Sequence, residues 1–141
     1  GRTLSNRDMT LWCSWVLSGE KERIFCNGDG SYGAHYKEIG ETYGPFDLVF
    51  MECGQYRRFV SAVHMMPEQG IQAVKDLRGQ CMIPIHWGVF NMSQPRWCGA
   101  VERAIPLAKE SGVCIETPKL GEVIHTKDNN FVPYWWDILN S

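Results

Sequence analysis

The sequence lacks the features that identify membrane, repeat or nucleic-acid-binding proteins at first sight. It has no apolar run of the length of a membrane span, no internal repeat and no low-complexity segment. Its 14 basic and 16 acidic residues give a formal net charge of −2, which offers no support for nucleic acid or an anionic membrane as a partner. No signal peptide opens the sequence, so we expect a cytoplasmic protein with no membrane span.

The six cysteines form no Cys-x-x-C pair and are spread evenly along the chain. This spacing argues against a zinc site or a disulfide framework built from neighbouring cysteines. Most of them lie in apolar runs, where cysteine behaves as a small buried hydrophobe. We therefore expect reduced thiols, as in a cytoplasmic protein, with disulfides as the alternative.

A chain of 141 residues with 44% hydrophobic residues suffices for one domain, 1–141. Six tryptophans are many for this length, and either the core or an interface must accommodate them. Apolar runs and turn residues predict strands that alternate with helices, which indicates an α/β fold with ligands at strand ends. The expected strands are 10–17, 23–26, 46–53, 82–85, 113–116 and 122–125; the expected helices are 33–43, 67–77 and 100–111 (kinked at Pro106), with a helical turn in 131–139.

Three polar side chains stand next to ends of these elements. Asp29 follows the 23–26 strand, His64 precedes the helix that begins at Pro67, and His86 follows the 82–85 strand. A carboxylate and imidazoles at neighbouring strand ends are typical ligands for zinc, iron or manganese. Each has an ordinary explanation too: Asn-Gly-Asp-Gly is a common turn sequence, and a single histidine after a strand is more often a structural residue.

Five short motifs occur in one order along the chain and support the functional interpretation. They are FCNGDGSY (25–32), GPFDL (44–48), GQY (54–56), HMMPE (64–68) and IPIHWGVF (83–90). Together they resemble the C-terminal half of the metallo-β-lactamase superfamily. The branch they resemble contains the phospholipase D that hydrolyses N-acyl-phosphatidylethanolamine and the sugar-lactone hydrolases. The most specific motif is His-Trp-Gly-x-Phe after Ile-Pro-Ile.

The resemblance implies a fold and a set of roles. The fold would be half of an αββα sandwich, with one mixed sheet and helices on one face. Asp29 would bridge two metals as a catalytic residue, and His86 would complete the second metal site. His64 would act as a catalytic and substrate-binding residue beside the substrate phosphate. The implied activity is metal-dependent hydrolysis of a phosphodiester or lactone, on a small-molecule or phospholipid substrate, with zinc (or iron or manganese).

The first half of that family carries a His-x-His-x-Asp-His cluster and one further histidine, and this sequence contains neither; His35 and His125 do not replace them. Two protein ligands cannot hold a dinuclear centre. One hypothesis is therefore a hydrolase unit that is inactive alone and needs an N-terminal half. A second is a non-catalytic half-domain, with vestigial site residues or one weakly bound metal, that homodimerises through its open sheet face. A third is an α/β interaction module whose motifs are coincidental.

Overall fold

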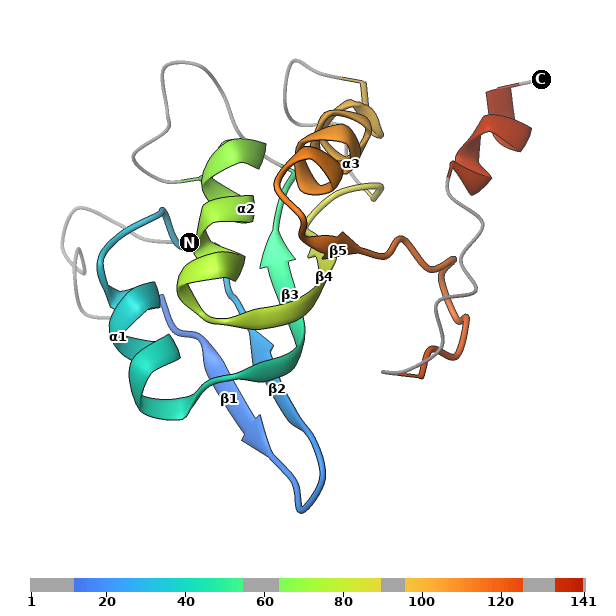
Figure 1. Cartoon of the computed structure of the whole chain (residues 1–141). Helices are drawn as coiled ribbons and strands as arrows, with labels where there is room; N and C mark the ends of the chain where they lie inside the picture. The colour runs from blue at the N-terminus through green and yellow to red at the C-terminus, as the bar shows by residue number, and fades with distance from the viewer. Residues whose placement is uncertain (1–11, 55–63, 90–95, 126–133, 141) are drawn as a thin grey trace, which may run out of the picture.

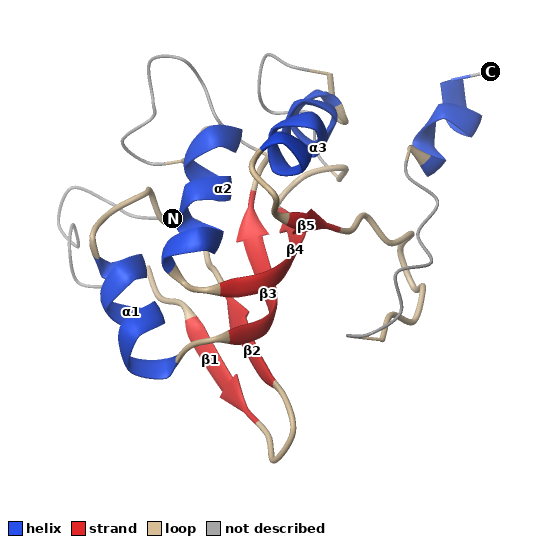
Figure 2. Ribbon diagram, viewed as in Figure 1, coloured by secondary structure: helices blue, strands red, loops and turns tan. Residues whose placement is uncertain are grey.

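The computed structural model describes residues 12–54, 64–89, 96–125 and 134–140, and within these a single five-stranded sheet carries three helices (Figure 2). The strand order is β1-β2-β3-β4-β5, with β1 antiparallel to β2 and all other neighbours parallel. The expected mixed α/β sheet is confirmed. The elements are β1 Trp15–Ser18, β2 Arg23–Cys26, α1 His35–Tyr43, β3 Phe46–Glu52, α2 Pro67–Asp76, β4 Gly79–Ile85, α3 Gly99–Glu110, β5 Cys114–Ile115 and the 3-10 helix η1 Trp135–Asn140.

The main core lies between one face of the sheet and the three helices (Figure 1). Strands β2, β3 and β4 are parallel, so two long crossovers, through α1 and α2, connect them. The strands contribute alternate side chains to this face, and the helices cover them with aromatic, branched and small residues. This core contains Phe25, Val49, Met51 and Met82 from the sheet and Tyr36, Ile71, Val74, Ala100, Ala104 and Ala108 from the helices.

The opposite face of the sheet, which we call the open face, is also apolar. A row of directly paired residues crosses all five strands: Leu17, Ile24, Leu48, Cys81 and Cys114. Residues of α1, α2 and α3 belong to the core on the other side, and none joins the cluster on this face. Its β1 end is the most accessible part, since Leu17 is 51% exposed. The expected arrangement, with helices on one face of the sheet, is thus present in the described residues.

Four of the six tryptophans, two of them in the C-terminal tail, form one cluster. Trp87, Trp97, Trp135 and Trp136 pack together, with ring centroids 5.2–6.5 Å apart. The Trp136 indole is fully buried and donates a hydrogen bond to Glu102 of α3 at 3.1 Å. These four side chains therefore pack against one another within the chain, with Trp136 fully buried and the other three partly buried. None of the helices in the described segments has the length and hydrophobicity needed to cross a membrane.

Two sequence-based expectations are wrong. Residues 122–125 form no strand; they follow a turn in which the Glu122 amide donates to the Lys119 carbonyl at 3.0 Å, and Ile124 packs on the open face. Cys81 and Cys114 form a disulfide, with Cα atoms 4.5 Å apart. The parallel pairing of β4 with β5 places these two residues directly opposite each other, which their separation in the sequence conceals.

The 100–111 helix was expected to bend at its proline, and the observed helix α3 runs from Gly99 to Glu110 with Pro106 inside it. The expected strand from 10 to 17 lies partly outside the described residues; residues 12–14 are not strand, and β1 runs from Trp15 to Ser18.

Two helical glycines provide a matched test of this packing. A Cβ at Gly40 of α1 would lie 2.8 Å from the Cα of Leu77, whereas a Cβ at Gly70 of α2 would have ordinary contacts from 3.5 Å outward. Helix propensity alone favours alanine at both positions by up to about 1 kcal/mol. We expect Gly70→Ala to stabilise the fold by that amount and Gly40→Ala to destabilise it by about 1–3 kcal/mol through overpacking. Urea unfolding followed by circular dichroism measures both, and equal effects would contradict the close contact of α1 with Leu77.

Candidate metal and acid–base site

The site lies where the carboxyl ends of three parallel strands meet. Asp29 follows β2, Glu52 is the last residue of β3, and His86 comes directly after β4. The amide of Cys53 donates to the carbonyl of Ile85 at 3.0 Å and so continues the pairing of β3 and β4 to their ends. Ligands in open α/β sheets collect at this edge, and the topology brings these polar side chains there.

Backbone geometry at the end of β4 requires two unusual residues. His86 has φ of +66°, in the left-handed region that non-glycine residues seldom adopt. A Cβ at Gly54 would overlap the carbonyl oxygen of His86, so only glycine allows this approach of the two chain segments. Backbone outliers of this kind concentrate at functional sites.

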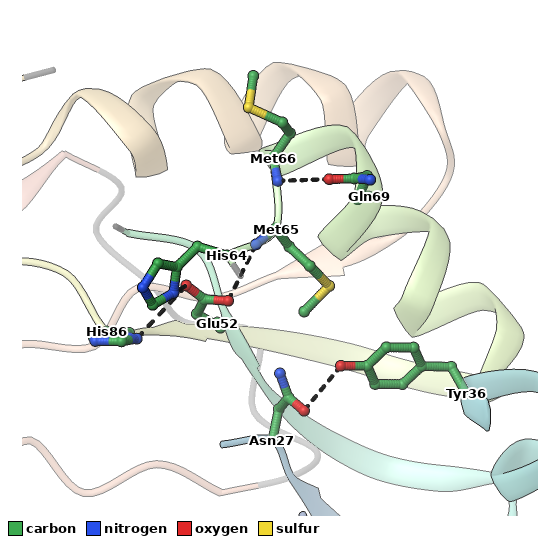
Figure 3. Close-up of polar contacts among 8 residues, drawn as sticks. All are labelled: Asn27, Tyr36, Glu52, His64, Met65, Met66, Gln69 and His86. Atoms are coloured by element: carbon green, nitrogen blue, oxygen red, sulfur yellow. Dashed lines mark hydrogen bonds and ion pairs between the residues drawn. The ribbon is translucent and has the colours of Figure 1, made fainter. Parts of the chain in front are cut away.

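Glu52 is the centre of the cluster (Figure 3). Its side chain is fully buried, and its Oε1 lies 2.6 Å from Nδ1 of His64 and 3.6 Å from Nδ1 of His86. Its other oxygen accepts a hydrogen bond from the backbone amide of Met65 at 3.2 Å. One buried carboxylate therefore faces two imidazoles and a backbone donor.

The electrostatics of this cluster follow from burial and mutual charge. Burial raises the pKa of Glu52; the Met65 amide and His64 oppose this rise, and the charge of Asp29 adds to it. Burial and the neighbouring His64 lower the pKa of His86, and the Asp29 carboxylate opposes that fall. Asp29 thus acts on both groups through its charge.

His64 is oriented by its contact with Glu52. Its Nδ1 faces the carboxylate, and in the tautomer that donates from Nδ1 the second nitrogen, Nε2, carries a free lone pair. The His64 and His86 rings meet edge to face, with centroids 5.3 Å apart and an interplanar angle of 74°. An imidazole held by a carboxylate in this way can transfer a proton or bind a metal.

The donor atoms of Glu52, His64 and His86 all lie within 4.8 Å of one another. One carboxylate oxygen and two imidazole nitrogens are a donor set that zinc, iron and manganese accept. The structure therefore brings His64 and His86 together, as the sequence motifs suggested. Asp29 is exposed and lies outside this group of three.

Sequence analysis missed Glu52, since we assigned it to a buried apolar strand. The signal was present: a carboxylate at the end of the run FDLVFME must be paired if it is buried. That pairing requirement predicts a partner, and His64 and His86 were already candidates. The residues 55–63 between Gly54 and His64, including the Gln55-Tyr56 motif, lie outside the described part of the chain.

The turn that carries Asp29 is fixed by a buried asparagine. The amide of Asn27 donates to the Phe50 carbonyl at 2.8 Å, and its side-chain oxygen accepts hydrogen bonds from Ser14 and Tyr36, both at 3.0 Å. Burial raises the pKa of Tyr36 to about 12, so it remains a neutral donor. These contacts hold the start of the turn at the end of β2 and leave Asp29 itself at the surface.

A cavity of about 310 Å³ adjoins the cluster through His86. Its walls come from the end of β4, the 117–121 segment and the tail, and most of its lining is apolar. Among the lining residues are Ile83, Trp87, Leu120 and Trp135, with Lys119 as a cation. The site therefore combines polar groups with an adjacent space for an apolar group.

The charge of Asp29 at this site can be tested directly. Asp29→Asn removes the negative charge that raises the pKa of His86, so we expect that pKa to fall further. An NMR titration of the His86 ring protons measures the change. Glu20→Gln, an exposed carboxylate in the β1–β2 turn, is the control and should leave the His86 titration unchanged. An unaltered His86 titration in Asp29→Asn would show that Asp29 lies too far away to act.

Comparison with known proteins places these features in a family. The Beta-lactamase superfamily domain matches residues 1–87. An uncharacterized protein of Mycobacterium tuberculosis, Rv0906, is 33% identical over 139 residues, covering 96% of this chain and 37% of that protein. N-acyl-phosphatidylethanolamine-hydrolyzing phospholipase D 1 of Caenorhabditis elegans is 37% identical over 94 residues, covering 64% of this chain and 26% of that protein. The chain thus spans little more than a third of the length of the first of these relatives.

Solved structures agree in fold. Igni18, a metallo hydrolase from the archaeon Ignicoccus hospitalis, superposes with a TM-score of 0.62 at 20% identity, covering 77% of this chain and 43% of that chain. The metallo-beta-lactamase fold protein YhfI from Bacillus subtilis gives a TM-score of 0.57 at 15% identity, covering 77% of this chain and 42% of that chain. The chain belongs to the β-lactamase superfamily domain family and has part of the metallo-β-lactamase fold of hydrolases, resembling the N-acyl-phosphatidylethanolamine phospholipase D branch.

Proposed function

We propose that this chain is the C-terminal half of a metal-dependent hydrolase that acts on a phosphodiester or a lactone. The observation that supports this proposal is the buried carboxylate of Glu52, shared by His64 and His86 at the carboxyl edge of the sheet. A fully buried carboxylate facing two imidazoles has little structural purpose that an apolar residue would not serve better. Strongly perturbed groups of this kind cluster at functional sites.

Glu52, His64 and His86 fit a divalent metal by donor type and separation. His86 and Asp29 are the proposed metal ligands, and Glu52 is a further candidate that only the structure reveals. A bound zinc, iron or manganese ion would polarise the scissile group and lower the pKa of a water molecule. Zinc is our first choice because carboxylate and imidazole are its usual donors outside thiolate sites.

His64 has the proposed role of a group that touches the substrate. Glu52 fixes the orientation of the His64 ring through Nδ1. The protonated ring can neutralise charge that develops on a phosphate, or give a proton to a leaving group. Glu52 is in this view a positioning residue for His64.

The substrate class is a small molecule or phospholipid with an apolar portion. The cavity beside His86 is lined mainly by apolar side chains, and Lys119 adds a positive charge. An anionic group near His86 and Lys119 with an apolar group in the cavity would satisfy both features. The relative from Caenorhabditis elegans, whose name specifies hydrolysis of N-acyl-phosphatidylethanolamine, supports a phosphodiester more than a lactone.

The remaining metal ligands would come from an N-terminal half packed on the open face. The described residues supply three donors in the Glu52 cluster and Asp29 near it, fewer than a dinuclear centre requires. The open face is apolar across five strands, as a face designed for burial against another sheet would be. We propose that the chain alone binds metal weakly and lacks turnover.

Its cytoplasmic location also stays a prediction.

Metal binding tests this function without requiring turnover. We expect the purified chain to bind zinc. Glu52→Gln and His86→Ala should each weaken its zinc affinity by tenfold or more, because mutation of a residue that only supports a metal ligand already lowers metal affinity about 10–100-fold. Calorimetry measures the affinity. His125→Ala removes an exposed histidine outside the cluster and should leave it unchanged. Phosphodiester hydrolysis should appear only when an N-terminal half carrying His-x-His-x-Asp-His is added.

Equal zinc affinity in wild type, Glu52→Gln and His86→Ala would contradict the metal site. Turnover by the chain alone that survives both Asp29→Ala and His86→Ala would contradict the roles assigned to these residues.

A non-catalytic homodimer is the second candidate, and the exposed apolar residues of β1 favour it. Trp15 and Leu17 are 65% and 51% exposed on the open face, where a second copy could cover them about a two-fold axis. This candidate predicts a dimer in sedimentation experiments. Leu17→Lys should then give a monomer, while Leu120→Lys, at a 91% exposed position outside the sheet, should remain a dimer. A monomeric wild-type chain would exclude this candidate.

A further inference from the structure

A second cluster of potential ligands lies on the open face, where β4 pairs with β5. The Glu52 cluster lies on the other side of β4, at the end of β3. The second cluster consists of Cys81 on β4, its partner Cys114 on β5, and Glu116 two residues further along the chain. The two sulfurs and a carboxylate oxygen of Glu116 all lie within 4.8 Å of one another. The amide of Glu116 donates to the Met82 carbonyl at 2.9 Å, so the β4–β5 pairing continues to this residue and places it on the same face as Cys114.

Glu116 is a largely buried carboxylate beside these two sulfurs. The residue is only 6% exposed, and no described residue donates a hydrogen bond to its side chain or forms an ion pair with it. Burial raises the pKa of this carboxyl group. A largely buried carboxylate is more stable when it is neutral or meets a cation, and one of its oxygens lies within 4.8 Å of both sulfur atoms.

We propose that Cys81, Cys114 and Glu116 form a binding site for a thiophilic divalent cation such as zinc when the disulfide is reduced. Two thiolates and one carboxylate are a zinc donor set, and sulfurs bound to one tetrahedral zinc at ~2.3 Å lie ~3.8 Å apart. Cys114 is exposed and Cys81 is 8% exposed, so a cation can reach the reduced pair from the Cys114 side. The site is distinct from the Glu52 cluster, and its existence does not depend on the proposed hydrolase function.

The oxidation state of the two cysteines then decides whether the site can form. A dithiol reductant gives two electrons and two protons to the Cys81–Cys114 bond and becomes a disulfide itself, which leaves two thiols. Binding of the cation releases both thiol protons and forms two metal–sulfur bonds. Oxidation removes both sulfur ligands and releases the ion. The cation also joins β5, a two-residue edge strand, to β4 in the reduced protein.

The test uses a chain with His64→Ala and His86→Ala, in which the other metal site is removed. We expect the protein reduced by a dithiol and desalted without oxygen to bind one Cd2+ per chain, with a thiolate-to-cadmium absorption band. The disulfide form should bind none. Cys114→Ser should weaken Cd2+ binding by tenfold or more. Glu116→Gln should weaken it by about tenfold while the thiolate-to-cadmium band remains, a loss similar to that seen when residues that support metal ligands are mutated. Cys13→Ser, which removes an exposed free thiol, is the matched control and should bind as the parent does.

Binding that is equal in the oxidised and reduced forms, or unchanged in Cys114→Ser, would overturn the proposal. An unaltered affinity in Glu116→Gln would also overturn the three-residue site. A measurement that needs no variant at Cys114 or Glu116 is thermal unfolding of the same His64→Ala, His86→Ala chain: Cd2+ should raise the Tm of its reduced form and not that of its disulfide form. Equal shifts in the two forms would likewise exclude the site.

Discussion

Burial of the Glu52 carboxylate is the constraint around which the carboxyl edge of the sheet is arranged. A charge removed from water at the end of an apolar strand must be compensated by nearby donors or cations. The chain supplies them from two directions: His64 and the Met65 amide from the segment before α2, and His86 from the end of β4. The left-handed backbone at His86 and the glycine at position 54 serve the same end, since they allow the two chain segments to approach.

The two faces of the sheet differ in what packs against them. One face is closed by α1, α2 and α3 and supplies the core, with small residues where helices approach closely. The other face is apolar, no helix of the described residues contributes to its cluster, and it carries a disulfide and a largely buried carboxylate at its β5 edge. A face of this composition fits an interface with another sheet, and a redox-dependent ligand set at its edge would make that interface sensitive to thiol chemistry.

The sequence predicted much of the fold because its turns are well marked. Arg23–Cys26 was predicted with its observed ends, and the helix beginning at Pro67 was recognised from the proline itself. The prediction failed for residues 122–125 although Gly121 marks their turn, because no strand of the described residues lies beside them to pair with. Two members of the candidate site, His64 and His86, were proposed from the sequence because motifs flank them, and the structure brings them together. Glu52 and the Cys81–Cys114 pair could not be found in this way, because their partners are close only through strand pairing between distant parts of the chain.

The parallel pairing of β2, β3 and β4 has a consequence for folding kinetics. Asp29, Glu52 and His86 each end a separate strand, and a crossover with its own helix stands between successive members of the set. Parallel pairing is non-local, so the entropy of closing each long loop must be met before the strands stabilise one another. We therefore expect the polar edge to assemble late and in one cooperative step. A nascent chain would form its helices first and the candidate site last.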